Sequence, residues 1–109
     1  MVREGLYRIQ FQTQLGSGAG VVFLEGGRVR GGDSRIFYTG TYSENGGQFT
    51  AQIETDLHTN APGMSSVLGR DRAHITLKGT TSGDSGQMTG TAIEAPGVVF
   101  QAVLTRIGN

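Results

Sequence analysis

Hydrophobic and polar residues alternate along three stretches of the chain, residues 7–12, 48–57 and 72–78. Successive side chains of a strand point to opposite faces, so an apolar residue at every second position is typical of a strand with one buried face. The apolar residues of the three stretches are Tyr7, Ile9, Phe11, Phe49, Ala51, Ile53, Leu57, Ala73, Ile75 and Leu77. The alternation therefore predicts an all-β fold.

Glycine, asparagine and proline mark the ends of the predicted strands. Residues 26–27 and 45–47 favour tight hairpins, because glycine and asparagine accept a positive φ. Residues 96–97 predict a further turn, and the small residues of 79–86 predict a longer loop. The predicted strands cover residues 5–14, 18–25, 28–32, 35–43, 48–58, 71–79, 87–94 and 98–107.

About eight short strands joined by hairpins indicate a small antiparallel up-and-down β-barrel, with a β-sandwich as the alternative. Residues 59–70 lack strand character. They favour one helical turn or an irregular crossing at a barrel end.

Two of the predicted strands contain runs that are apolar on both faces, residues 20–24 and 98–104. The outer face of such a strand must be covered, and a small monomeric barrel has little left to cover it. We therefore expect a homodimer; in a sandwich, the second sheet would supply the cover instead. The predicted dimer contacts are Val21, Phe23, Val99 and Val103.

The interior of a barrel of about eight strands is either filled by side chains or holds one small ligand. The residues predicted to line it are Tyr7, Ile9, Phe11, Phe49, Ile53, Ile75, Leu77, Phe100 and Leu104. Small residues on the same face leave space for a pocket, namely Ala51, Ala73, Gly90, Ala92 and Ala102. A packed core and a site for a small apolar, lipid-like ligand both remain open at this point.

Composition narrows the choice of partner and compartment. Nine basic and nine acidic residues give a net charge of zero, which argues against direct binding of nucleic acid. The chain contains no cysteine, and it shows neither a signal peptide nor the run of roughly 20 apolar residues that spans a bilayer. We expect a cytoplasmic protein with one domain over residues 1–109 and no membrane contact.

Three features resemble catalytic or ligand sites, and each lacks the rest of its site. Residues 83–86 match the segment around the nucleophile of chymotrypsin-like proteases, but that fold needs two barrels, so we interpret them as a turn. Residues 16–20 resemble a phosphate-binding glycine loop without the helix that such a loop requires. His58 and His74 fall on the outer face, where we expect them to be solvated. The sequence thus predicts no catalytic residue, metal site or cofactor, and no enzyme.

Three arginines surround a glycine-rich corner at residues 31–33. Arg28 and Arg30 share one strand face and can form a small anion site, but we favour solvated arginines, Arg35 included, paired with nearby carboxylates. Asp33 is expected to cap backbone N–H groups of the bend, and Gly32 to adopt a positive φ.

Four segments, residues 4–9, 18–22, 30–33 and 38–44, resemble the GrlR-type negative regulators of type III secretion. The resemblance implies a lipocalin-like barrel that forms a homodimer and binds a helix-turn-helix transcriptional activator. The family's acidic recognition motif corresponds to residues 44–47, where only the first acidic residue is kept. The resemblance therefore places a partner-binding loop at Ser43, Glu44 and Asn45.

Two functions follow from these observations. The first is a non-enzymatic regulator of transcription that acts through protein contacts. The alternative is a carrier or sensor of a small apolar ligand in the barrel lumen.

Overall fold

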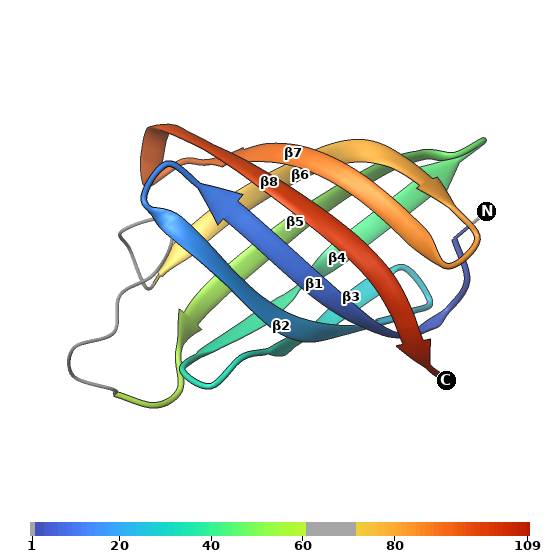
Figure 1. Ribbon diagram of the computed structural model, residues 1–109, viewed down its shortest axis with the longest axis horizontal. Helices are drawn as coiled ribbons and strands as arrows, with labels where there is room; N and C mark the ends of the chain where they lie inside the picture. Colours follow the sequence, from blue (N-terminus) through green and yellow to red (C-terminus); the bar gives the residue numbers. More distant parts are fainter. Residues whose placement is uncertain (1, 61–71) are drawn as a thin grey trace.

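Eight antiparallel strands form a closed β-barrel in the computed structural model, which describes residues 2–60 and 72–109 (Figure 1). The strands are β1 (Gly5–Thr13), β2 (Gly16–Glu25), β3 (Arg28–Gly32), β4 (Ile36–Asn45), β5 (Gln48–Leu57), β6 (Ala73–Ser82), β7 (Ser85–Ala92) and β8 (Ala95–Gly108). The predicted all-β barrel is confirmed. The segment predicted to cross a barrel end, 59–70, lies outside the described residues from position 61 onward.

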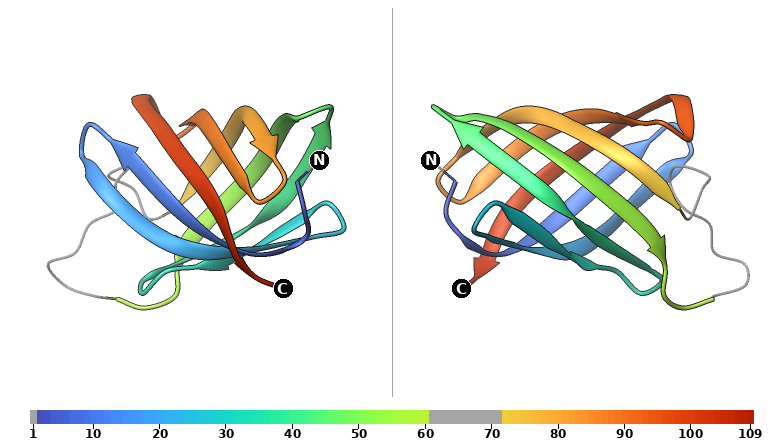
Figure 2. Two further views of the ribbon diagram at one scale, coloured as in Figure 1. Left: turned by 45° about the vertical axis from the view of Figure 1, so that its right-hand side comes forward. Right: turned by 180° about the vertical axis from the view of Figure 1, so that it is seen from behind.

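Each strand pairs with the next one along the chain, and β8 pairs with β1 to close the barrel (Figure 2). The closing ladder runs from Leu6 opposite Gly108 to Gln12 opposite Gln101, with a register shift after Leu6. Closure leaves neither β1 nor β8 as an unpaired edge, which a sandwich would have. The alternative of two packed sheets is therefore excluded.

Alternate residues of every strand turn into the barrel and form one apolar core, as the two-residue pattern predicts. The buried core residues are Tyr7, Ile9, Val22, Leu24, Val29, Ile36, Tyr38, Phe49, Ala51, Ile53, Ala73, Ile75, Leu77, Met88, Ala92, Phe100, Ala102 and Leu104. The two runs that are apolar on both faces also obey the pattern. In the first run Val22 and Leu24 are buried, whereas Val21 and Phe23 are more exposed. In the second run Phe100 is buried and Val99 is exposed.

The N-terminal segment closes one end of the barrel. Tyr7 is fully buried there, and its hydroxyl donates hydrogen bonds to the carbonyl oxygens of Arg3, at 2.6 Å, and Gly83, at 3.3 Å. Val2 forms a parallel bridge with Gly83, and its N–H donates to both carboxylate oxygens of Glu44 at 2.8 Å. Residues 2–7 are thus joined to two hairpin ends.

The two glycine-rich hairpins are confirmed. Gly26 and Gly27 have φ values of 59° and 80°, and Gly46 and Gly47 have values of 60° and 87°. These are left-handed conformations that other residues rarely adopt, which explains the glycine pairs in the sequence.

The β6–β7 and β7–β8 connections differ from the prediction. Residues 79–86, expected to form a loop, mostly continue the ladder, and the chain turns tightly at Gly83, which has a φ of 60°. The small residues of this segment carry no hydrophobic alternation, yet their backbones pair normally. The β7–β8 turn lies at Ile93 and Glu94, with Ala92 opposite Ala95, so β8 begins before Pro96 rather than after it.

Gly32 does not have the positive φ expected for it. Its role is to allow close contact instead, because a Cβ atom there would lie 2.7 Å from the carbonyl oxygen of Ile36. The close contact follows from the pairing of β3 with β4, in which Gly32 lies opposite Phe37.

Candidate functional site

A cavity of about 300 Å³ lies inside the barrel. At one end its lining includes the exposed residues Ser17 and Ser34, so the cavity reaches the surface between the β1–β2 and β3–β4 connections. These two connections lie at the opposite end of the barrel from the two chain termini (Figure 1), and we call this opening the mouth. The walls are mostly aliphatic and aromatic, and Ala51 contributes one of the small side chains expected to leave space.

The structure places all nine residues predicted to line the lumen inside the barrel. Eight of them line the cavity, namely Ile9, Phe11, Phe49, Ile53, Ile75, Leu77, Phe100 and Leu104. Tyr7 is the exception, because it fills the closed end. Further lining residues that were not singled out from the sequence are Val22, Leu24, Val29, Ile36, Tyr38 and Met88. Most of these residues occupy the inward positions of their strands, so the two-residue pattern could have identified them.

Three aromatic rings meet near the mouth. Phe11 stacks on Phe100 of the neighbouring strand, with ring centroids 5.6 Å apart, and contacts Tyr38 edge to face at 6.3 Å. Phe11 lies on β1 and Tyr38 on β4, which are not adjacent in the sheet. The contact therefore reaches across the lumen.

Asp33 organises the polar side of the mouth. One of its carboxylate oxygens accepts the backbone N–H groups of Arg35, at 2.9 Å, and Ile36, at 2.8 Å, and the other accepts the hydroxyl of Tyr38 at 2.5 Å. The capping role expected for Asp33 is thus confirmed. Burial opposes ionisation, but these hydrogen bonds and the charge of Arg35 hold the pKa of Asp33 below its usual value.

Arg35 is buried at the mouth, with only 6% of its surface exposed, so the expectation of a solvated side chain is wrong. Both polar groups of its backbone are bonded. The N–H of Arg35 donates to Asp33, and its carbonyl oxygen accepts the N–H groups of His58 and Thr59 at 2.8 and 3.2 Å. Arg28 and Arg30 lie exposed on β3. The three arginines therefore do not share one environment.

The predicted partner-binding loop is the β4–β5 hairpin at the closed end. Ser43 and Asn45 are exposed, whereas Glu44 bonds to the backbone N–H of Val2 and accepts the hydroxyl of Thr81. The hydrogen bond from Thr81 is the main cause that lowers the pKa of Glu44. Its carboxylate holds the barrel end together, so its acidic charge is turned toward the protein's own backbone.

The predicted dimer contacts lie on the outer face of the barrel. Val21, Val99 and Val103 are 42%, 57% and 40% exposed, and Phe23 is partly buried. Val21 pairs with Arg8, and Val103 pairs with Gln10. The polar residues of β1 thus separate the apolar residues of β2 from those of β8, which makes two strips rather than one.

His74 is not simply solvated. Its Nδ1 lies 2.5 Å from one oxygen of Glu94, its backbone N–H donates to the other at 2.7 Å, and its Nε2 lies 3.2 Å from Glu54. The hydrogen bond to Glu94 and the two negative charges raise the pKa of His74, and the same bonds lower the pKa of Glu94 to about 2. His58 is exposed, and its Nε2 lies 2.9 Å from the Asp33 carbonyl oxygen.

The remaining motifs have structural roles. Residues 83 and 84 form the β6–β7 turn, as expected, whereas Ser85 and Gly86, predicted to belong to the same turn, already start β7; residues 16–20 form the start of β2. Within residues 2–60 and 72–109, no group of three histidine or acidic side chains is arranged to hold a metal ion. The same residues include no helix long and apolar enough to cross a bilayer.

No known protein-family model matches this chain, and no curated protein matches it. The resemblance to GrlR-type regulators stays a prediction. The function must therefore be argued from the cavity and its surroundings.

Proposed function

We propose that this protein binds a small apolar molecule in the barrel lumen and acts as its carrier or sensor. The observation that carries the proposal is the apolar cavity of about 300 Å³ with a mouth at one end. Protein interiors are normally filled to the density of organic crystals, so a void of this size is unusual in so small a core. Its volume matches the smaller ligand pockets of known proteins.

The side chains that line the cavity favour an apolar ligand. Aliphatic and aromatic walls give a bound molecule the hydrophobic effect as its main source of affinity, at roughly 25 cal/mol for each Å² of apolar surface removed from water. The described hydroxyl-bearing residues of the lining are Ser17, Ser34, Tyr38 and Thr55. Thr55 pairs with Tyr38, whose hydroxyl bonds to Asp33 at the mouth, and the deeper walls offer alkyl groups and rings. A water-soluble, multiply polar molecule would lose hydrogen bonds there without replacement.

A paired substitution tests the proposal. Ala51 lines the cavity, and the adjacent Gln52 lies on the outer face of the same strand. Ala51→Phe fills the lumen, whereas Gln52→Phe adds the same ring outside. We expect the neutral dye N-phenyl-1-naphthylamine to fluoresce on binding to the unmodified protein and to Gln52→Phe, and to lose at least tenfold in affinity for Ala51→Phe.

The far-UV circular dichroism spectra of both variants should match that of the unmodified protein, as a check that they keep its β structure. Equal dye binding by the two variants would place the dye on the surface, and no binding by the unmodified protein would refute the proposal.

A second candidate is the regulator that acts through protein contacts, including a homodimer and a helix-turn-helix activator as partner. The exposure of Val21, Val99 and Val103 favours it, because these residues form two apolar strips that flank β1 on the outer face, and exposed apolar surface of this kind suits a protein contact. The two candidates are compatible, since the lumen and the outer face are separate.

A further inference from the structure

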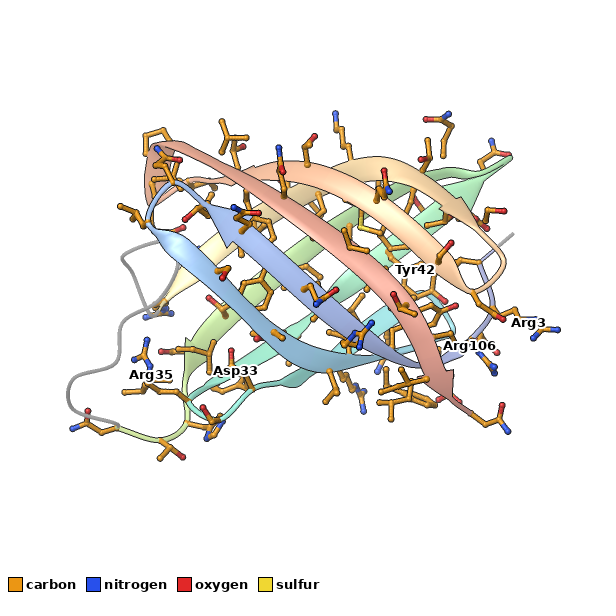
Figure 3. All side chains as sticks on the ribbon, in the orientation of Figure 1. Arg3, Asp33, Arg35, Tyr42 and Arg106 are labelled. Atoms are coloured by element: carbon orange, nitrogen blue, oxygen red, sulfur yellow. The ribbon has the colours of Figure 1, made fainter. Side chains whose placement is uncertain are left out.

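The charged residues among the described lining of the cavity are Asp33 and Arg35, and both lie at the mouth (Figure 3). Figure 3 also shows Arg3, Tyr42 and Arg106 at the opposite, closed end. The lumen is therefore polarised along its length, with apolar walls inside and a fixed ionic group at the entrance.

Asp33 is committed to the fold. Its two carboxylate oxygens accept three hydrogen bonds, from two backbone N–H groups and from the hydroxyl of Tyr38. Its negative charge stays at the mouth, but its oxygens already serve the bend and β4. A ligand would gain little by replacing these bonds.

Arg35 is the cationic residue of the described lining. A guanidinium carries five N–H donors in a planar fork, so it can serve several acceptors at once. Arg35 is 6% exposed and lines the cavity, and its backbone is bonded to Asp33 on one side and to His58 and Thr59 on the other. The main chain that carries the guanidinium is thus already ordered at the mouth and need not be ordered when a ligand binds.

We propose that the ligand is an amphipathic carboxylic acid, whose apolar tail occupies the lumen and whose carboxylate binds Arg35 at the mouth. This inference rests on the proposed function, since it needs an occupied lumen. The cavity of about 300 Å³ admits a tail of on the order of ten heavy atoms, if each takes about the 30 Å³ of a water molecule. A single acyl chain fits this space, and a two-chain lipid does not.

The charge of the headgroup follows from the neighbouring Asp33. An alkyl phosphate presents the same kind of oxygens to an arginine but carries nearly two negative charges. Asp33 stays ionised beside Arg35 and repels the second charge. The mouth therefore favours a singly charged carboxylate over a phosphate monoester.

Isothermal titration calorimetry with three probes of one chain length tests this inference. The probes are decanoate, 1-decanol and decyl phosphate, measured with the unmodified protein and with Arg35→Gln. We expect the unmodified protein to bind decanoate at least tenfold more tightly than decanol, and more tightly than decyl phosphate. Arg35→Gln is expected to lose at least tenfold for decanoate and to bind decanol unchanged.

A variant with the exposed Arg8 replaced, Arg8→Gln, has the same change in net charge and should bind all three probes like the unmodified protein. Decanol binding by Arg35→Gln reports an intact lumen. If Arg35→Gln does not fold, the comparison of the three headgroups on the unmodified protein still tests the inference.

Equal affinity for decanoate and decanol would overturn the inference and leave the apolar lumen in place. Tighter binding of decyl phosphate would overturn the choice of carboxylate. Failure of all three probes while the naphthylamine dye binds would refute the acyl-chain ligand alone. Failure of the dye as well would refute the proposed function.

Discussion

Glu94 fastens the β7–β8 turn to β6 through both of its carboxylate oxygens. One oxygen accepts the backbone N–H of His74 and the other lies against its imidazole, while the N–H of Ile93 donates to the His74 carbonyl oxygen at 3.1 Å. One acidic side chain thus extends the hydrogen bonding of the sheet beyond its last paired residues.

This pair makes stability depend on pH in a defined window. The pKa of His74 is raised above 6.5, so its contribution is complete below pH 6.5 and is lost as pH rises through the folded pKa. The pKa of Glu94 is lowered from 4.5 to about 2, so its contribution is present above pH 4.5 and is lost as pH falls toward 2.

We expect Glu94→Gln to reduce the urea midpoint most between pH 4.5 and 6.5, and less once the pH exceeds the raised pKa of His74, where the imidazole is neutral. In the same variant the NMR titration midpoint of His74 should fall. If the NMR titration midpoint of His74 is the same in the variant and in the unmodified protein, Glu94 does not hold the proton on His74.

Single residues are also where the sequence was least informative. The alternating pattern located Phe49, Ile53 and Leu77 inside the barrel, because strand geometry dictates the side of each residue. The burial of Arg35 could not be predicted in this way. Arg35 lies in a connection without periodicity, and its charge suggests exposure. Its environment depends on hydrogen bonds from His58 and Thr59, just after β5, which only the folded chain brings near.

At the scale of strands, glycines allow the sheet to bend tightly enough to close. A Cβ atom at Gly31, Gly40 or Gly79 would lie 1.9 or 2.0 Å from a carbonyl oxygen of the neighbouring strand. One at Gly90 would lie 2.1 Å from such an oxygen. Glycine kinks of this kind introduce the curvature that barrels need. The high glycine content of the chain thus has a cause beyond its turns.

Gly40→Ala tests this role. The added methyl group would meet the Gln52 carbonyl oxygen at 1.9 Å, so the strands must separate, and we expect a loss of about 1–3 kcal/mol in the free energy of unfolding. The control is Gly97→Ala, which meets no atom within 4 Å and should leave stability unchanged or slightly increased. Equal urea midpoints for the two variants would contradict the close approach.

The pattern of strands was predicted better than their limits. Hydrophobic alternation and paired glycines located β1, β3 and β5 to within a residue or two. The β6–β7 hairpin was predicted as a loop, because Thr80, Thr81 and Ser82 offer no apolar partner to the alternation. Their backbones pair all the same, since closure of the barrel holds β6 and β7 side by side.

At the scale of the whole molecule, the outer face carries apolar residues that the closed sheet leaves exposed. Val99 and Val103 lie on β8, and Val21 and Phe37 lie on β2 and β4. The ladder places Val21 and Phe37 on either side of Gly32. A second copy of the barrel remains the partner predicted for this face.

Val103→Glu tests the predicted homodimer. A charge placed in an apolar contact without a partner is costly to bury, so we expect multi-angle light scattering to show a dimer for the unmodified protein and a monomer for the variant. Gln52→Glu adds the same charge on β5 and should leave the dimer intact. A variant that keeps the dimer mass while folding normally would exclude Val103 from the contact.

Val2, Arg3 and Tyr7 close one end of the described barrel, so the proposed ligand would enter and leave through the mouth alone. A second ligand molecule could then enter only after the first had left. Under the proposed function, the exchange rate would therefore equal the dissociation rate of the bound molecule, and a higher concentration of competitor would not accelerate it.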